Sequence, residues 1–230
     1  MNLKDIEGKI GLEFKNKNLL KTAFIHRSYL NEHPKERLGH NERMEFLGDS
    51  VLGFIISDYL FEKFPKHPEG DLTNFRSSIV NAKILSVVAR ELGLGKYLFL
   101  SRGEEATGGR DRQYLLANTY ESLLGAIYLD SGTESSKKFI HKTLLPHLKT
   151  IIENKLYKDY KSQLQEIAQA KFNITPNYNI ISEKGPDHTK TFETGAYLDK
   201  KLLAKGEGRS KQDAEQEAAK RALDKLGKLK

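Results

Sequence analysis

Apolar residues recur at three-and-four spacing through the first two-thirds of the chain, and this period predicts amphipathic helices. Pro65 and the turn at residues 68–70 should end one helix, and Asp71 should cap the next. The polar, glycine-rich segment 101–113 should form a loop or a short helix. Residues 1–152 are therefore predicted to form one all-helical domain, with helices over 18–30, 41–64, 71–91, 113–129 and 136–156, the last with a candidate break at Pro146.

The pattern changes at residue 159. A helix over residues 159–171 is followed by segments in which apolar and polar residues alternate, which is typical of strands. An alanine-rich helix with Ser210 as its N-cap should close the chain. The sequence thus predicts a small α+β domain of order α-β-β-β-α over residues 159–230, joined by a charged linker at 153–158, with strands over 177–185, 190–199 and 200–210.

The composition narrows the class of protein. A net charge of +7 and a pI near 9.3 favour a polyanionic partner, although lysine enrichment for solubility alone would give the same balance. The absence of cysteine excludes disulfides and cysteine zinc sites and fits a reducing cytosol. No apolar run approaches the roughly 18 residues of a membrane span, and the charged N-terminus does not resemble a secretory signal. We therefore expect a cytoplasmic protein with no membrane partner.

Three acids occupy an otherwise apolar helical segment. Glu42, Glu45 and Asp49 are spaced i, i+3 and i+7, so they line one stripe of a helix. Three carboxylates on one stripe repel one another unless a cation lies among them, and carboxylate oxygens suit a hard cation such as Mg²⁺ or Mn²⁺. The alternative is a solvated acidic face. Gly48 costs roughly 1 kcal/mol against Ala in a helix, which suggests a close backbone approach.

A second apolar helix offers further ligands. Within residues 115–130, Asn118 and Glu121 are spaced i, i+3, and Glu69 in the turn at 68–70 is a third source of carboxylate. Oxygen ligands from two buried helices would form a compact cage for a divalent cation. A cation with free coordination positions can activate water and stabilise charge on a phosphate.

Several segments, in order, closely resemble the ribonuclease III family: "AFIHRSYLNE", "NERMEFLGDSVLG", "FPKHPEGDLTNFRSSIV", "SRGEEATGGR" and "LLANTYESLLGAIYLD". The resemblance covers essentially the whole chain. It implies that Glu45, Asp49 and Glu121 bind catalytic Mg²⁺, for which Mn²⁺ can substitute. It also implies accessory roles for Glu42 and Glu69, and a homodimer in which Phe46 fills a pocket of the partner.

The resemblance further implies cleavage of double-stranded RNA to products with 5′ phosphates and short 3′ overhangs, including ribosomal RNA precursors. One position departs from the family, because Asn118 stands where an aspartate is usual. Its amide oxygen can ligate a cation without adding charge, so we expect weaker metal binding. Asp111 lies about 10 Å upstream along a continuous helix, too far to replace it. The alternative function is a non-cleaving RNA-binding or ribosome-assembly protein.

The C-terminal part resembles a double-stranded RNA-binding domain. Its first helix carries a polar stripe opposite a core side expected to contain Leu164, Ile167 and Ala168. Uncharged polar side chains suit the 2′-hydroxyls and base edges of the RNA minor groove, and basic residues at a helix N-terminus suit phosphates. Each feature alone is also typical of solvent-facing residues. The residues expected to contact RNA are Ser162, Gln165, Gln169, His188, Arg209 and Lys211.

Overall fold

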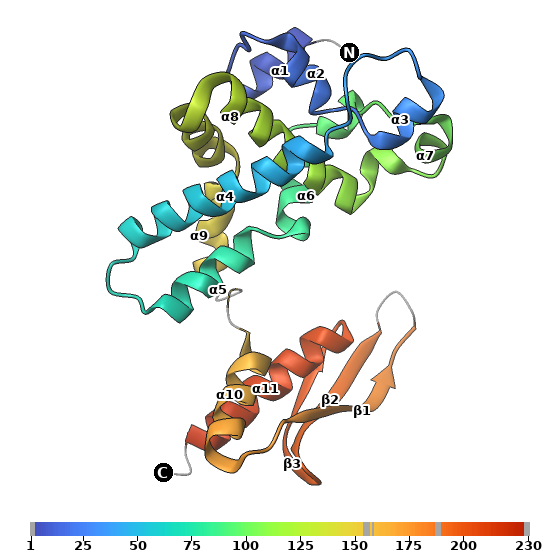
Figure 1. Cartoon of the computed structure of the whole chain (residues 1–230). Coiled ribbons are helices and arrows are strands. Elements are labelled where there is room, and N and C mark those ends of the chain that lie inside the picture. The colour runs from blue at the N-terminus through green and yellow to red at the C-terminus, as the bar shows by residue number, and fades with distance from the viewer. Residues whose placement is uncertain (1–2, 154–156, 158, 187–189, 228–230) are drawn as a thin grey trace. The chain divides into compact units, whose positions relative to one another are not determined.

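The computed structural model describes residues 3–153, 157, 159–186 and 190–227. The chain forms two compact units, Met1–Tyr157 and Lys158–Lys230, which Figure 1 shows as a helical part and a smaller part with a sheet. Within the part of the chain that the structure describes, no helix has the length and apolar character needed to cross a membrane. The expected fold class, an all-α domain followed by an α+β domain, is confirmed.

Apart from one isolated bridge between Ile25 and Phe99, the regular elements of the first unit are all helices among its described residues. Its elements are α1 (Leu3–Ile10), α2 (Lys17–Thr22), α3 (Arg27–Glu32), α4 (Glu42–Lys63), α5 (Glu69–Ile79), α6 (Ala82–Glu91), η1 (Leu94–Tyr97), α7 (Arg102–Ala106), η2 (Gly109–Asp111), α8 (Gln113–Thr143) and α9 (Leu145–Glu153). Helices α4 and α8 pack most extensively against each other and supply much of the buried apolar core. This packing follows from their sequences, because most of the buried residues of both helices are apolar.

Two predicted helices are each interrupted in the structure. The segment 18–30 divides into α2 and α3 because Ile25 leaves the helix to form a parallel bridge with Phe99. The segment 71–91 divides at Val80, and the Asn81 side chain accepts a hydrogen bond from the Ile84 N–H to begin α6. The bridge at Ile25 and the cap at Asn81 each replace helical hydrogen bonds. The three-and-four spacing of apolar residues continues through both breaks, so it could not reveal them.

Two further helix boundaries differ from the prediction. Helix α5 begins at Glu69, with Pro68 before it, so Asp71 lies in its first turn and is not its cap. Proline is compatible with this position because the first N–H groups of a helix need no partner. The helices expected over 113–129 and 136–156 both lie in the span of α8, and Gly132, whose φ of 74° is not helical, separates them as expected. The second of them breaks at Leu144 rather than at Pro146.

The second unit has the predicted α-β-β-β-α order, and its elements are α10 (Tyr160–Phe172), β1 (Asn177–Lys184), β2 (Thr191–Leu198), β3 (Lys201–Gly208) and α11 (Lys211–Gly227). The strands form an antiparallel sheet in the order β1-β2-β3. Helix α11 packs closely on β3, where a Cβ on Gly206 would lie 2.1 Å from the Ala218 nitrogen. Leu164 and Ala168 are buried as expected, but Ile167 is 37% exposed and is not a core residue.

Candidate active site and RNA-binding surface

Two glycines allow the backbones of α4 and α8 to touch where they cross. A Cβ on Gly48 would lie 1.7 Å from the Glu121 carbonyl oxygen, and a Cβ on Gly125 would lie 2.2 Å from the Met44 carbonyl oxygen. Any side chain there would force the helices apart. The expectation that Gly48 permits a close backbone approach is confirmed. This contact brings the acid-bearing turn of α4 next to the turn of α8 that carries Asn118 and Glu121.

The carboxylates at this crossing influence one another's protonation. Burial, with further contributions from Asp49 and Glu45, raises the pKa of Glu121 to about 7. Burial and the charge of Glu42 raise the pKa of Glu45, a hydrogen bond with Asn118 opposes this rise, and the charge of Asp49 adds to it. Glu45, Asp49 and Glu121 form no ion pair with any of the described residues. The crossing is therefore a site of uncompensated negative charge.

The side chains of Glu45, Asp49, Glu121 and Asn118 offer three carboxylates and one amide oxygen. These are hard ligands, which suit a divalent cation such as Mg²⁺. Binding a cation would also draw protons off Glu121, so affinity should weaken as the pH falls below about 7. In their present positions, no three His, Cys, Asp or Glu side chains of the described residues could share one ion. Coordination of one cation by three carboxylates therefore requires side chains of the cluster to move closer together.

The remaining acids differ in their surroundings. Glu42 lies one turn before Glu45 and is 3.7 Å from both Arg27 and His40, so its charge is partly balanced. Glu69 accepts a hydrogen bond from Thr73 at the start of α5. Figure 1 shows that α5 begins beyond the C-terminal end of α4, which is about 33 Å long. Within one protomer, Glu69 therefore does not join the cluster, whereas Glu42 adjoins it.

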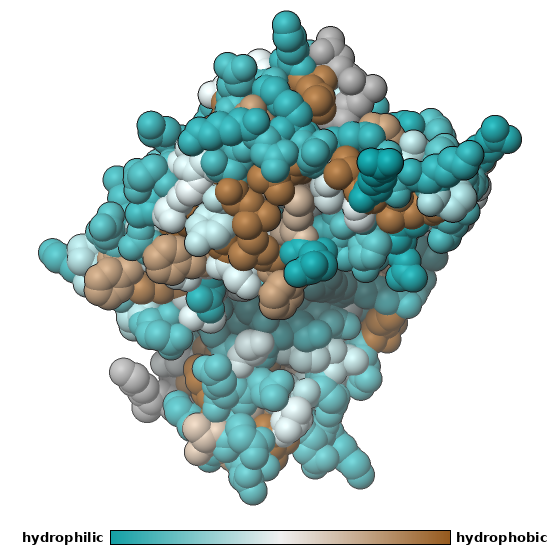
Figure 2. Space-filling model, turned by 45° about the horizontal axis from the view of Figure 1, so that its top comes forward, coloured by the Kyte–Doolittle hydropathy of each residue, from teal (hydrophilic) through white to brown (hydrophobic). Residues whose placement is uncertain are grey.

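The expected dimer residue is strongly exposed. Phe46 is 77% exposed on α4, and Phe54 and Phe61 on the same helix are 61% and 75% exposed. Their spacing places all three within about 80° around the helix. Figure 2 shows that the otherwise hydrophilic surface of the protein carries apolar patches. Exposed phenylalanines aligned on one helix face are typical of a surface that a partner covers.

The second unit presents most of its expected RNA contacts at the surface. Ser162, Gln165 and Gln169 line one shallow depression on α10. Arg209 and Lys211 are exposed at the start of α11, where Ser210 accepts a hydrogen bond from the Asp213 N–H as the predicted cap. Lys211 lies 3.9 Å from Glu183, which reduces its free charge. His188 lies outside the described residues.

Sequence reasoning did not identify three residues that shape the site. Gly125 matches Gly48, since each glycine follows an acid by one turn in an apolar helix, and this repetition could have revealed it. Arg27 and His40 flank Glu42, but they lie on α3 and in the loop before α4. No spacing rule relates residues on different elements, so only the fold could place them.

Comparisons with known proteins assign both parts of the chain to the same family of nucleases. Residues 16–148 match the family described as Ribonuclease-III-like, and residues 160–226 match the double-stranded RNA binding motif. A protein named Ribonuclease 3 from Streptococcus gordonii is 47% identical over 217 residues, 94% of this chain and 93% of the relative. Ribonuclease 3 from Dehalococcoides mccartyi is 46% identical over 98% of this chain and 95% of its own length.

A solved structure supports the same assignment. The nuclease domain of ribonuclease III from Campylobacter jejuni aligns with a TM-score of 0.59 and 37% identity, covering 63% of this chain and 97% of that domain. The fold and the acid cluster thus define the class of protein, a helical nuclease unit joined to a unit with the double-stranded RNA-binding fold. The chain belongs to the ribonuclease III family, whose members are endoribonucleases.

Proposed function

We propose that this protein is a divalent-metal-dependent endoribonuclease that hydrolyses the phosphodiesters of double-stranded RNA. The observation that carries the proposal is the backbone contact between α4 and α8, which gathers Glu45, Asp49 and Glu121 without a balancing cation from the protein. The oxygen-only donor set favours Mg²⁺, and Mn²⁺ should substitute. When bound, the cation would offset negative charge that develops on the scissile phosphate.

Each residue of the cluster has a distinct part in the proposal. Glu45, Asp49 and Glu121 would hold the cation, and Asn118 would contribute its amide oxygen while its amide N–H orients Glu45. Glu42 would adjust the charge next to the site through its contacts with Arg27 and His40. Glu69 lies near the other end of α4 within its own protomer. It would therefore act at the acid cluster only if it came from a partner protomer.

The remaining parts of the proposal concern assembly and products. The exposed phenylalanine face of α4 supports a homodimer with Phe46 at its interface. Two sites in one dimer would cut both strands, leaving 5′ phosphates and short 3′ overhangs. The second unit would hold the duplex through α10 and the start of α11. Structured transcripts, including precursors of ribosomal RNA, are the proposed substrates.

The direct test is incubation with a long RNA duplex, once with Mg²⁺ and once with Mn²⁺. We expect cleavage with both ions and none with a chelator. The opposite result, binding of the duplex without cleavage under either ion, would replace the proposal with a non-cleaving RNA-binding protein. Asn118 is the residue that favours this alternative, because its amide supplies no negative charge to the cation site.

Restoring an acid at position 118 should strengthen metal binding. We expect Asn118→Asp to lower the Mg²⁺ concentration for half-maximal cleavage, because a fourth carboxylate adds attraction for the cation. The same change removes the amide N–H that favours ionised Glu45, so the gain should be larger at the higher pH, where Glu45 is ionised without that hydrogen bond. Metal titrations at two pH values would measure it. An unchanged or higher Mg²⁺ requirement at both would contradict the assigned role of Asn118.

Removal of the second unit should weaken substrate binding most at physiological salt. A chain ending at Tyr157 loses the polar face of α10 and the basic start of α11. Because phosphate contacts weaken steeply with salt, we expect the KM for duplex RNA to rise more at 150 mM salt than at about 20 mM. Cleavage assays at both salt concentrations would measure the difference. Equal KM values for the full and shortened chains at high salt would assign the second unit another task.

A further inference from the structure

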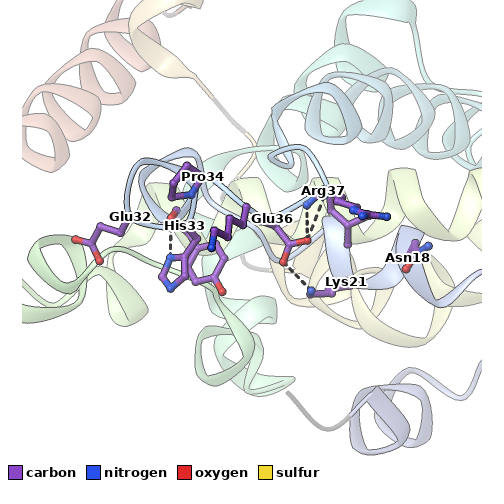
Figure 3. Close-up of a pocket in the computed structure, with 10 residues that line it drawn as sticks. Asn18, Lys21, Glu32, His33, Pro34, Glu36 and Arg37 are labelled. Atoms are coloured by element: carbon purple, nitrogen blue, oxygen red, sulfur yellow. Dashed lines mark hydrogen bonds and ion pairs between the residues drawn. The ribbon is translucent and has the colours of Figure 1, made fainter.

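A pocket of about 710 Å³ lies in the first unit, apart from the acid cluster. It is bounded by α2, α3 and the loop at residues 33–38 that leads toward α4. Figure 3 draws the acidic, basic and aromatic side chains that line this pocket. Some of the charged side chains that line the pocket already have partners within the protein, and others do not. This difference decides what the pocket can bind.

Both acids of the pocket are engaged within the protein. One carboxylate oxygen of Glu36 accepts from Lys21 at 2.8 Å, and the other accepts from the Arg37 and Leu38 backbone N–H groups at 3.0 and 3.2 Å. Both oxygens of Glu32 lie 3.2 Å from the Arg102 N–H at the start of α7. Lys21 therefore neutralises Glu36, whereas Glu32 is held by a backbone N–H and keeps its negative charge.

Two cations of the pocket remain available. Lys35 and Arg37 are exposed, and neither side chain forms an ion pair with any of the described residues. They flank Glu36, whose backbone hydrogen bonds hold this part of the loop in place. The result is a positively charged rim on a fixed loop, and Arg37 offers the planar donors that suit a phosphate group.

The pocket also contains a flat aromatic surface. The His33 ring stacks on Tyr29 with 3.8 Å between the ring centroids and 14° between the planes. Nδ1 of His33 donates to the Tyr29 carbonyl oxygen at 2.9 Å, and Tyr29 also packs on Phe99. His33 is exposed, and Tyr29 holds its ring on one face. A nucleobase can stack on such a surface.

The pocket lies within reach of RNA held at the acid cluster. Arg27, the first residue of α3, is 3.7 Å from Glu42, and α3 extends about 9 Å from there to His33. A phosphate site beside a stacking surface fits a nucleotide, but the bases of a duplex are already stacked on one another. Only an unpaired nucleotide could use both features.

We propose that this pocket binds an unpaired nucleotide of the RNA substrate, next to its double-stranded part. Its base would stack on His33 and its phosphate would contact Arg37 and Lys35. This inference rests on the proposed function, since it assumes that the duplex itself is bound at the acid cluster. It predicts that the protein distinguishes RNAs with the same duplex by their single-stranded extensions.

The test compares two RNAs that share one duplex, one blunt and one with short single-stranded extensions. Binding is measured with Ca²⁺ in place of Mg²⁺, for the intact protein and for His33→Ala and Arg37→Ala. Because stacking of one base is worth about 1–3 kcal/mol, we expect His33→Ala to weaken binding of the extended RNA about tenfold. Arg37→Ala should also weaken it, because it removes a phosphate contact, and both variants should leave the blunt duplex unchanged. Lys83→Ala removes a similarly exposed cation on α6 and is the matched control.

A second measurement locates the contact. A 4-thiouridine placed in the extension should crosslink to the peptide that contains residues 29–38. Equal loss of affinity for both RNAs, an effect no larger than that of Lys83→Ala, or crosslinks confined to other peptides would overturn the inference. Cleavage of the blunt duplex by the intact protein with Mg²⁺ tests the proposed function separately, so failure of one can be told from failure of the other.

Discussion

Replacement of Glu121 by glutamine is expected to reduce cleavage of duplex RNA by about a thousandfold or more, with duplex binding unchanged. Glutamine has nearly the same shape and keeps an oxygen ligand but has no charge, so the site would lose the negative charge of its most buried acid. Single-turnover cleavage and a binding assay would measure the two effects. Asp111→Asn is the matched control, because it removes the same charge from an exposed residue outside the cluster.

The stability of the same variant provides an independent check. Glu121 has a pKa near 7 in the folded protein against an ordinary value of 4.5, so the folded state binds the extra proton more tightly. The intact protein without metal should therefore lose stability as the pH rises from about 4.5 to 7, and Glu121→Gln should reduce this loss. Unfolding at several pH values would show it. Lost RNA binding or an unfolded variant would mean that Glu121 is not a metal ligand but a structural residue.

Replacement of Gly48 by alanine is expected to destabilise the first unit by about 3 kcal/mol or more. The added methyl group would lie 1.7 Å from the Glu121 carbonyl oxygen, which is backbone and cannot turn aside. The two helices would have to separate, and the acids of α4 would then move away from Glu121. We expect the melting temperature to fall by about 10 °C and cleavage to fall with it.

Gly53 is the matched control for this substitution. It lies on the same helix, and a Cβ there would meet nothing within 4 Å. Because alanine is the better helix former, Gly53→Ala should leave stability unchanged or raise it by up to about 1 kcal/mol. Thermal unfolding of both variants would distinguish them. If Gly48→Ala were as stable as Gly53→Ala, the helix crossing would not be as close as the structure indicates.

The helical and α+β parts could be predicted from the sequence because their patterns are local. The three-and-four spacing of apolar residues identified most of the helical segments, and alternation identified β1, β2 and β3. The breaks at Ile25 and Val80 could not be predicted. Ile25 pairs with Phe99, which is far away in sequence, and no local pattern around residue 25 marks that bridge.

By itself, the sequence determined the acid stripe on α4, the second pair on α8 and the need for a close approach at Gly48. Spacing and composition are sufficient for such features, since a helix fixes which of its own residues share a face. Only the tertiary structure decided that Glu121 lies near enough to Glu45 and Asp49 for their charges to raise its pKa, and that Glu69 lies at the other end of α4. It also decided that Glu32 and Glu36 are held by hydrogen bonds within the protein. These relations join different elements, and their distances depend on how the helices pack, which no periodic pattern encodes.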